Sequence, residues 1–357
     1  MALNSTSLTA EMTISVIIPV YNGGESFRQC LASLARSTLP ANEVIVVADG
    51  DTDGSWRIAE EHGARVLRLS TTGGPARARN CGARLARGDI LLFVDADVSV
   101  AGNTICQVIA AFRKEPALAA IFGSYDDEPA ASNFLSQYKN LLHHYVHQTA
   151  SEEASTFWGA CGAIRREVFL ALDGFDERYR WPSIEDIELG YRLKQAGKRV
   201  RLCKTLQVKH LKRWEIGSLL KADFFFRALP WTALILRDRH LPNDLNLRLS
   251  GRLSVLFTYG LLGAALGGWW RLELSTVAGG CALGLLLLNA PLYHFFWCKR
   301  GWRFVLQAVP WHWLYYFYSG LAFVIGVIYY LSCGENRPTG APTISRKEAG
   351  SEERAES

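Results

Sequence analysis

The sequence predicts an α/β domain with a mainly parallel sheet and flanking helices, followed by an α-helical membrane region of about three spans. Short apolar runs alternate with helical patterns from Ile14 to Asp95, and this alternation is typical of a parallel sheet with helices on both faces. Near the C-terminus, three long stretches contain no charged residue. Eight of the 11 tryptophans lie from Trp214 onward, where amphipathic rings suit a bilayer interface.

Four strands and three intervening helices are predicted in the first part of the chain. Ligands of such sheets bind beyond the carboxyl ends of the strands, so the residues after each apolar run are the first candidates for a site. Two of the four strand ends are acidic. The predicted strands are Ile14–Val20, Glu43–Val47, Ala64–Leu69 and Ile90–Val94, and the predicted helices are Glu25–Ser37, Ser55–His62 and Ala76–Arg87.

Asp95 and Asp97 follow a buried strand and are candidates for a metal site. Alternate side chains of a strand share a face, so two carboxylates at this spacing can hold Mg²⁺ or Mn²⁺. The similar pattern Asp51-Thr52-Asp53 is interpreted as a solvated turn. The first strand is followed neither by Gly-x-Gly-x-x-Gly nor by a P-loop pattern, which disfavours a dinucleotide fold and a P-loop NTPase.

Four motifs in order resemble those of family 2 glycosyltransferases: residues 15–22, 46–55, 74–80 and 95–97. The resemblance covers about residues 13–214. It implies a GT-A fold, a Rossmann-like domain that binds a nucleotide sugar such as a UDP- or GDP-sugar. It also implies a divalent metal cofactor, Mg²⁺ or Mn²⁺, and inversion at the anomeric carbon.

The resemblance also implies roles for single residues. Donor binding is assigned to Pro19, Tyr21, Asn22, Glu25, Asp49, Arg79 and Asp95, and metal binding to Asp97, Asp95 and His210. Asp49 is expected to face the base, and Arg79 to reach towards the base or the diphosphate. Ala48-Asp49 stands where the family has an Asp-Asp pair, so one acidic contact to the nucleoside is missing and the base preference stays open.

The segment around Glu185 and Asp186 resembles the family's Glu-Asp element at the start of a helix. Inverting transfer needs a base that removes the proton of the acceptor hydroxyl, and we expect Asp186 to be that base and Glu185 to shape the acceptor site. The alternative is an acid that interacts with the helix dipole. Trp158 and Gly159 resemble the segment that admits the acceptor, whereas Cys161 is interpreted as a packing residue.

His210 ends a strand-like segment and has three interpretations. It is a metal ligand, a structural histidine, or the first residue of an incomplete Gln-x-x-Arg-Trp element that continues to Arg213 and Trp214 on the acceptor side. The incomplete element, with no span expected before the domain, argues against a processive synthase. The three histidines at 143, 144 and 147 are interpreted as surface or packing residues, and the loops between 124 and 157 are expected to hold acceptor specificity.

The three uncharged stretches are predicted as membrane spans. A span needs about 20 apolar residues, and buried helices of a large soluble core are the alternative. The stretches are Leu253–Trp270, Leu274–Cys298 and Phe304–Gly334. Because Pro310 interrupts the last one, its crossing is expected to start near Trp311.

Arginines precede the first span, Lys and Arg residues follow the second, and the turn between these spans holds only Arg271 and Glu273, which predicts a cytosolic N-terminal domain. We expect a multi-pass protein of the bacterial inner membrane. The predicted divisions are a flexible N-terminus (1–12), the GT-A domain (13–214), amphipathic interface helices (215–250), three spans (251–334) and a disordered tail (335–357). An ordinary amphipathic core helix is the alternative for the interface segment.

Charge and cysteine content narrow the partners. The net charge of +5 suits phosphates or lipid headgroups and is too small to indicate nucleic acid. The eight scattered cysteines indicate neither a zinc site nor a disulfide framework. The sequence therefore predicts a metal-dependent, inverting glycosyltransferase that moves one sugar to a lipid or lipid-linked acceptor at the cytosolic membrane face. A processive polysaccharide synthase and a non-catalytic membrane scaffold are the alternatives.

Overall fold

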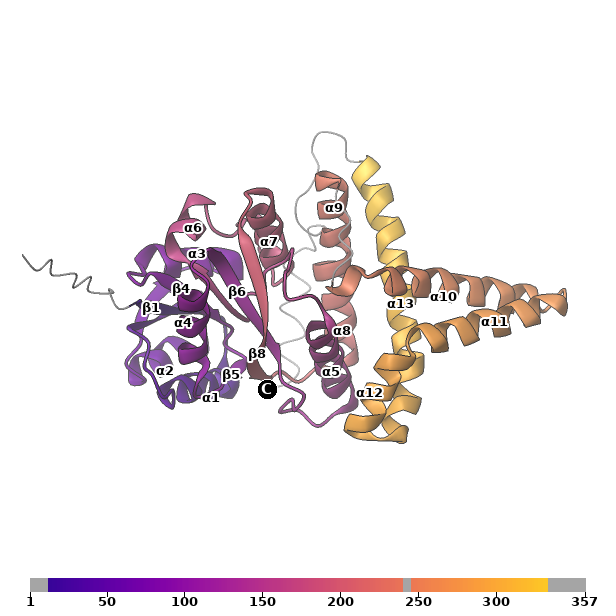
Figure 1. The fold of residues 1–357 in the computed structure, drawn as a ribbon, viewed down its shortest axis with the longest axis horizontal. Helices are drawn as coiled ribbons and strands as arrows, with labels where there is room; N and C mark the ends of the chain where they lie inside the picture. The colour runs from indigo at the N-terminus through magenta and orange to yellow at the C-terminus, as the bar shows by residue number, and fades with distance from the viewer. Residues whose placement is uncertain (1–11, 240–244, 333–357) are drawn as a thin grey trace, which may run out of the picture.

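The computed structural model of the chain describes residues 12–239 and 245–332 (Figure 1). The predicted disordered tail and all but Met12 of the predicted flexible N-terminus lie outside the described residues. An eight-stranded sheet, in the order β3-β2-β1-β4-β7-β6-β8-β5, forms the centre of the first domain. Its strands are β1 Ile14–Val20, β2 Glu43–Asp49, β3 Arg65–Leu69, β4 Ile90–Val94, β5 Val98–Val100, β6 Leu118–Tyr125, β7 Cys161–Arg165 and β8 Arg199–His210.

The sheet is mixed and mostly parallel, which confirms the predicted fold class. β1 pairs in parallel with β2 and β4, and β2 pairs in parallel with β3. β7 is antiparallel to both neighbours, whereas β6 and β8 are parallel and β5 is antiparallel to β8. Because β1, β2 and β4 run in one direction, their carboxyl ends and the loops that follow share one edge of the sheet.

Both faces of the sheet are covered by apolar side chains. Val16, Val46 and Leu92 belong to the core on one face, whereas Ile17 and Leu91 belong to the core on the other. Helices α1, α2 and α4 contribute to the first core, and α3, α6 and α7 to the second. The helices of this domain are α1 Gly24–Ala35, α2 Ser55–Glu61, α3 Pro75–Leu85, α4 Thr104–Lys114, α5 Phe134–Thr149, α6 Arg166–Ala171 and α7 Glu185–Gln195.

The C-terminal part of the chain is helical and lies beside the first domain. Helices α10 and α11 pack together as a hairpin that projects away from the sheet, and α9 runs along α13 (Figure 1). The elements are α8 Ile216–Lys221, the π-helix η1 Ala222–Ala228, α9 Leu229–Asp238, the short 3₁₀ helix η2 Leu245–Leu247, α10 Leu249–Gly267, α11 Glu273–Leu288, α12 Ala290–Arg300 and α13 Trp302–Ser332.

The structure alters the predicted spans. Among the described residues, α10 and α13 are each long and apolar enough to cross a membrane. The predicted second span is divided into α11 and α12, which are bent by 60° at their junction, so a third crossing exists only if this pair counts as one span. The stretch that contains Pro310 forms one helix, α13, which begins at Trp302 and continues through Pro310.

Polar and apolar contacts join the C-terminal helices to the first domain. The Arg300 guanidinium of α12 donates to Gln137 Oε1 of α5 over 2.7 Å. In the same interface, Phe296 of α12 packs against Tyr138 of α5, with ring centroids 6.0 Å apart. The segment predicted to lie in the headgroup plane forms α8, η1 and α9; η1 and α9 pack against α13, and α8 packs against η1. The C-terminal helices therefore extend the first domain on the side of α5.

Candidate active site

The loops at the carboxyl edge of the sheet are tied together by side chains of the predicted donor site. Asn22, in left-handed backbone conformation with φ +48°, accepts a hydrogen bond from the Thr52 amide over 2.8 Å. Asp53 accepts one from the Gly24 amide over 3.1 Å, so the Asp51-Thr52-Asp53 turn also holds the first loop. The ring of Tyr21 is 49% exposed and free to contact a ligand.

Asp49 ends β2 and binds the loop before α3. Its carboxylate accepts hydrogen bonds from the amides of Gly73 and Gly74 over 2.8–3.1 Å. Gly74 has φ +92°, and a Cβ atom there would lie 2.2 Å from the carbonyl oxygen of Arg180. Asp49 is expected to face the base, and in the structure its carboxylate also shapes the loop before α3.

Pro19 and Glu25 flank the first loop. Pro19 is part of β1 and pairs in register with Val47. Glu25 lies in the first turn of α1, where it is solvent-exposed and forms an ion pair with Arg28 at 3.9 Å. Both residues therefore lie beside the predicted donor site, and neither contacts the ion pairs that Arg79 forms with Asp95 and Glu185.

Arg79 of α3 joins the two acidic motifs. Its guanidinium forms ion pairs with Asp95 Oδ1 at 2.6 Å and with Glu185 Oε1 at 2.8 Å. Although burial opposes a charge here, these carboxylates raise the pKa of Arg79. The residue was expected to reach the base or the diphosphate. In the structure, its guanidinium fixes the end of β4 against the start of α7.

Asp186 lies in the first turn of α7, where its carboxylate accepts hydrogen bonds from the amides of Gly159 over 3.0 Å and Ile187 over 2.8 Å. Burial and the neighbouring charge of Glu185 raise the pKa of Asp186 to about 7. A helix N-terminus alone would stabilise the anion and lower the pKa. The raised value therefore favours a group that can take up a proton near neutral pH over an acid that only serves the helix dipole.

Asp97 and His210 meet because β5 and β8 are antiparallel neighbours. His210 Nε2 lies 3.8 Å from Asp97 Oδ2. Burial opposes the charge on Asp97, but the contact with His210 outweighs it and lowers the pKa of Asp97 to about 2. Burial raises the pKa of Asp95, and this carboxylate is already paired with Arg79. Asp97 is thus the carboxylate that is anionic and not engaged by a buried guanidinium.

The donor set fits a divalent cation that is shared with a phosphate ligand. Within residues 12–239 and 245–332, no three His, Cys, Asp or Glu side chains gather as a ready-made metal site. A carboxylate and an imidazole 3.8 Å apart can both reach one ion. Mg²⁺ is commonly held by one or two carboxylates together with substrate phosphates. Asp97 and His210 are therefore the residues that would hold such an ion.

Aromatic side chains form the wall next to Asp186. Tyr125, at the end of β6, stacks on His210 with ring centroids 4.2 Å apart and contacts Trp158 edge-on at 4.8 Å. Trp214 lies beyond His210 at 6.5 Å. Trp158 and Trp214 thus both belong to this wall, whereas Arg213 extends into solvent and pairs with Glu215. Tyr125 belongs to no predicted motif, and only its place at the end of a strand could have identified it.

The remaining uncertain residues near this wall are packing residues. His147 is buried and its Nδ1 lies 3.1 Å from the Gly123 carbonyl oxygen, and His143 lies against Trp158 with ring centroids 4.8 Å apart. His144 is also buried. Burial and the charge of Asp95 raise the pKa of the Cys161 thiol to about 12, and a protonated thiol agrees with a packing role.

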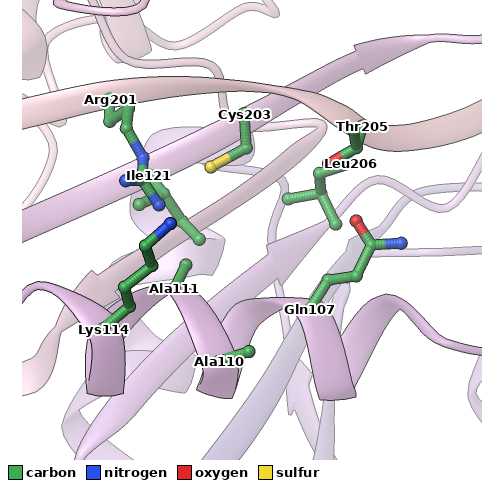
Figure 2. Close-up of a pocket in the computed structure, with 9 residues that line it drawn as sticks. All are labelled: Gln107, Ala110, Ala111, Lys114, Ile121, Arg201, Cys203, Thr205 and Leu206. Atoms are coloured by element: carbon green, nitrogen blue, oxygen red, sulfur yellow. The ribbon is translucent and has the colours of Figure 1, made fainter.

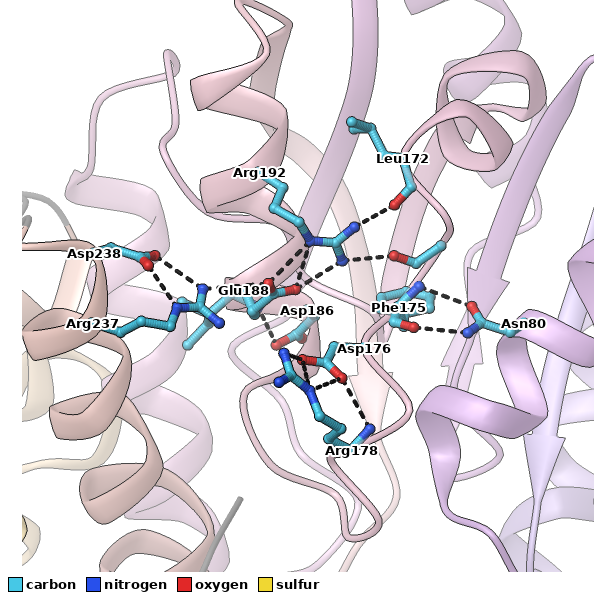
Figure 3. Close-up of polar contacts among 12 residues, drawn as sticks. Asn80, Leu172, Phe175, Asp176, Arg178, Asp186, Glu188, Arg192, Arg237 and Asp238 are labelled. Carbon is cyan, nitrogen blue, oxygen red and sulfur yellow. Dashed lines mark hydrogen bonds and ion pairs between the residues drawn. The ribbon is translucent and has the colours of Figure 1, made fainter. Parts of the chain in front are cut away.

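A network of ion pairs fixes helix α7 from the side opposite the sheet (Figure 3). Glu188 is buried and pairs with Arg192 at 2.8 Å and with Arg237 of α9 at 3.4 Å. On the other side, Asn80 of α3 donates to the Phe175 carbonyl oxygen over 2.8 Å. The helix that carries Asp186 is therefore held by α3 and by the C-terminal helices together.

A cavity of about 260 Å³ lies elsewhere in the domain, between α4 and β8 (Figure 2). It is lined by Lys114, Arg201 and Thr205 and by apolar side chains such as Ile121. Its lining shares no residue with the predicted site and contains no carboxylate. The cluster around Asp186 and Asp97, rather than this cavity, therefore carries the residues suited to group transfer.

Comparison with known proteins agrees with this geometry. A model of glycosyl transferase family 2 matches residues 15–172. Glycosyltransferase GlyG of Streptococcus pneumoniae is 32% identical over 126 residues, which cover 34% of this chain and 42% of that protein. The uncharacterized glycosyltransferase YibD of Escherichia coli is 42% identical over 92 residues, covering 24% and 26%. The chain thus spans less than half of the length of these relatives.

Among solved structures, mannosyltransferase PcManGT from Pyrobaculum calidifontis, in complex with GDP-Man and Mn²⁺, has a similar fold. Its TM-score is 0.57 at 16% identity, and the match covers 88% of each chain. At this identity, the likeness concerns the fold alone. It extends beyond residues 15–172, so the C-terminal helices contribute to the matched length.

Proposed function

We propose that the chain, whose residues 15–172 match a model of glycosyl transferase family 2, is an inverting, metal-dependent glycosyltransferase. It transfers one sugar from a nucleotide-sugar donor to a lipid or lipid-linked acceptor. The observation that carries the proposal is the position of Asp186, a carboxylate with a pKa of about 7 that is held by the Gly159 amide at the start of α7.

Asp186 acts as the general base of the transfer. Its carboxylate removes the proton of the acceptor hydroxyl while the hydroxyl oxygen attacks the anomeric carbon of the donor. The bond from oxygen to the anomeric carbon forms as the bond from that carbon to the diphosphate oxygen breaks, and the nucleoside diphosphate leaves. Such proton transfer contributes about 10²–10⁴-fold to a rate. In-line attack from the opposite side accounts for inversion.

Asp97 and His210 are the residues that would hold a divalent cation for the leaving diphosphate. When bound, the ion neutralises the negative charge that develops on the diphosphate oxygens. Arg79 keeps Asp95 and Glu185 in place and so sets the distance between the donor edge and α7. Tyr21, which is half exposed, contacts the nucleoside. PcManGT, which shares the fold, binds GDP-Man and Mn²⁺, and this supports a nucleotide sugar and a divalent cation as ligands.

The lipid acceptor is inferred from the C-terminal helices. Two helices of the described chain are long and apolar enough to cross a membrane, and they join the domain on the side of α5. Trp269 and Trp270 are highly exposed at the tip of the α10–α11 hairpin, as expected for rings at a bilayer interface. The site therefore faces a membrane surface on which a lipid-linked acceptor diffuses, and we place this surface on the cytosolic side.

The proposal is tested by donor turnover. The full chain, purified in detergent, is incubated with Mn²⁺ and a panel of UDP- and GDP-sugars, and release of the nucleoside diphosphate is measured. We expect turnover of at least one donor that stops on chelation of the metal. No turnover of any donor overturns the proposal. If lipid extracts then yield a ladder of products rather than a single addition, the single-transfer part of the proposal is wrong.

A further inference from the structure

Arg227 is a cation of the C-terminal helices that reaches the catalytic wall. It lies in η1, with 44% of its side chain exposed, and its Nη1 pairs with Asp223 Oδ1 at 3.0 Å. Among the described residues, this is the one hydrogen bond of its guanidinium. A guanidinium has five N–H donors, so most of its donors remain available to a ligand.

The packing of η1 brings Arg227 close to the segment that leads into Asp186. The Ser183 hydroxyl, three residues before Asp186, donates to the carbonyl oxygen of Phe226. The Arg227 Cζ atom lies 6.0 Å from the centre of the Trp214 ring. Although burial opposes the charge, Asp223, Tyr125 and Asp186 all raise the pKa of Arg227. The guanidinium therefore lies on the acceptor side of the site, away from the strand ends that face the donor.

The surrounding charges do not balance. Asp223 is buried and binds Lys139 at 2.7 Å, Arg227 at 3.0 Å and the Tyr318 hydroxyl at 2.9 Å. Two cations share one carboxylate, so the group carries a net charge of +1. Lys212 adds a further ammonium 4.3 Å from the centre of the Trp214 ring. Because the Arg227 side chain is 44% exposed, an anion can reach this excess of positive charge, and the arrangement favours an anionic ligand.

The local backbone is also unusual. Residues 222–228 form a π-helix between α8 and α9, and such segments are rare and concentrate at functional sites. Asp223 at its start accepts a hydrogen bond from Tyr318 of α13, whereas Arg227 near its end faces the catalytic wall. The segment thus links a candidate membrane-spanning helix to the acceptor side of the site.

We propose that Arg227 binds a phosphate group of the acceptor, next to the hydroxyl that Asp186 activates. This inference rests on the proposed function and narrows its acceptor to a phosphate-bearing lipid. The planar guanidinium matches phosphate oxygens with paired hydrogen bonds, and the donor diphosphate is served separately by Asp97 and His210. Because η1 contacts α13, the phosphate belongs to a lipid headgroup rather than to a free anion.

The test measures binding without requiring turnover. The full chain in uncharged detergent is titrated calorimetrically with dodecyl phosphate, dodecanol and inorganic phosphate. We expect dodecyl phosphate to bind, and Arg227→Ala to weaken this binding at least about tenfold, because the charged hydrogen bonds to the phosphate are lost. Arg227→Lys keeps the charge and restores part of the affinity. Lys221→Ala, which removes a cation of α8 outside the site, leaves the affinity unchanged.

Four outcomes overturn the inference. They are wild-type affinity in Arg227→Ala, an equal loss in Lys221→Ala, equal binding of dodecanol, and binding of inorganic phosphate as tight as that of dodecyl phosphate. Donor turnover is measured on the same samples. If dodecyl phosphate binds through Arg227 but no donor is turned over, only the proposed function is refuted. If a donor is turned over but dodecyl phosphate does not bind through Arg227, only the phosphate site is refuted. If Arg227→Ala does not fold, Arg227→Lys decides, because it keeps the ion pair with Asp223 and loses the paired hydrogen bonds.

Discussion

Replacing Asp186 with Asn separates the stability of the protein from its activity. The pKa of Asp186 rises from 3.8 to about 7 in the folded protein, a change of about 3 units that corresponds to about 4 kcal/mol. Between these pH values the folded protein keeps a proton that the unfolded chain releases. The free energy of unfolding therefore falls by up to about 4 kcal/mol as the pH rises from about 4 to 7.

An Asn side chain cannot ionise, so this loss disappears in Asp186→Asn. The carboxylate accepts one backbone hydrogen bond on each oxygen, from Gly159 and Ile187. Asn retains one acceptor oxygen, and the lost bond costs about 1 kcal/mol. At about pH 8 we expect Asp186→Asn to be more stable than the wild type by about 3 kcal/mol, whereas at about pH 4 it is less stable by about 1 kcal/mol.

Chemical denaturation of both proteins across this pH range measures the difference. Asp176→Asn is the matched control, because burial opposes the charge on Asp176 but hydrogen bonds from Arg178 lower its pKa, so its neutralisation destabilises the protein above about pH 4. Donor turnover by Asp186→Asn falls about 10²–10⁴-fold, and wild-type turnover rises with pH up to about 7 and then levels. A variant that keeps most of its turnover, or shows no pH-dependent gain in stability, would refute the reasoning.

Three further changes test the rest of the site. Gly74→Ala should lower the free energy of unfolding by about 3 kcal/mol or more in denaturant titrations, because the added Cβ would clash with the Arg180 carbonyl. Gly54→Ala is the control: Gly54 also has a positive φ, +81°, but no atom lies near its Cβ position, so its free energy of unfolding should fall by only about 1 kcal/mol. Arg79→Ala leaves two carboxylates without their partner and should cost about 3–5 kcal/mol, and a loss below about 1 kcal/mol contradicts the bridge. Asp97→Asn should weaken Mn²⁺ binding in the presence of UDP or GDP, followed by electron paramagnetic resonance, and unchanged affinity would remove Asp97 as a ligand.

The first half of the sheet was predictable because its signals are local. β1 and β4 match the predicted strands, and β2 and β3 differ from them at their ends, since each strand is an apolar run bounded by turn residues. β6 and β7 lie outside the predicted strands. Only the end of β8 was predicted. Its first half carries charged side chains such as Arg199, Arg201 and Lys204, which interrupt the apolar run by which a strand is recognised in the sequence.

The site was predictable where the motif itself contains the chemistry. Asp97 and Asp186 stand in segments that resemble a family, and the structure brings their motifs to one cluster. The partners of Arg79 were not predictable from spacing, since Glu185 is 106 residues away in the sequence. Arg227 belongs to no motif, and its relation to the site depends on how η1 packs between Ser183 and α13. Such long-range contacts carry no local sequence signal.

The predicted spans illustrate a different limit, because the effect of proline depends on its surroundings. Pro310 was expected to interrupt the last span, yet α13 continues through it. Pro291 attracted no prediction, although it lies in the first turn of α12, just after the 60° bend.

Asn289 stabilises the bend between α11 and α12. Its side-chain amide donates to the Leu285 carbonyl oxygen over 2.9 Å and to Ser254 over 3.0 Å, and its oxygen accepts from the Tyr316 hydroxyl. The polar groups at the bend are therefore satisfied by neighbouring helices, as an apolar environment requires. A hydropathy window averages over this asparagine and cannot distinguish a straight span from a broken one. The bend directs α12 towards α5, and Arg300 of α12 donates to Gln137 of α5. The second half of the stretch Leu274–Cys298 therefore packs against the first domain.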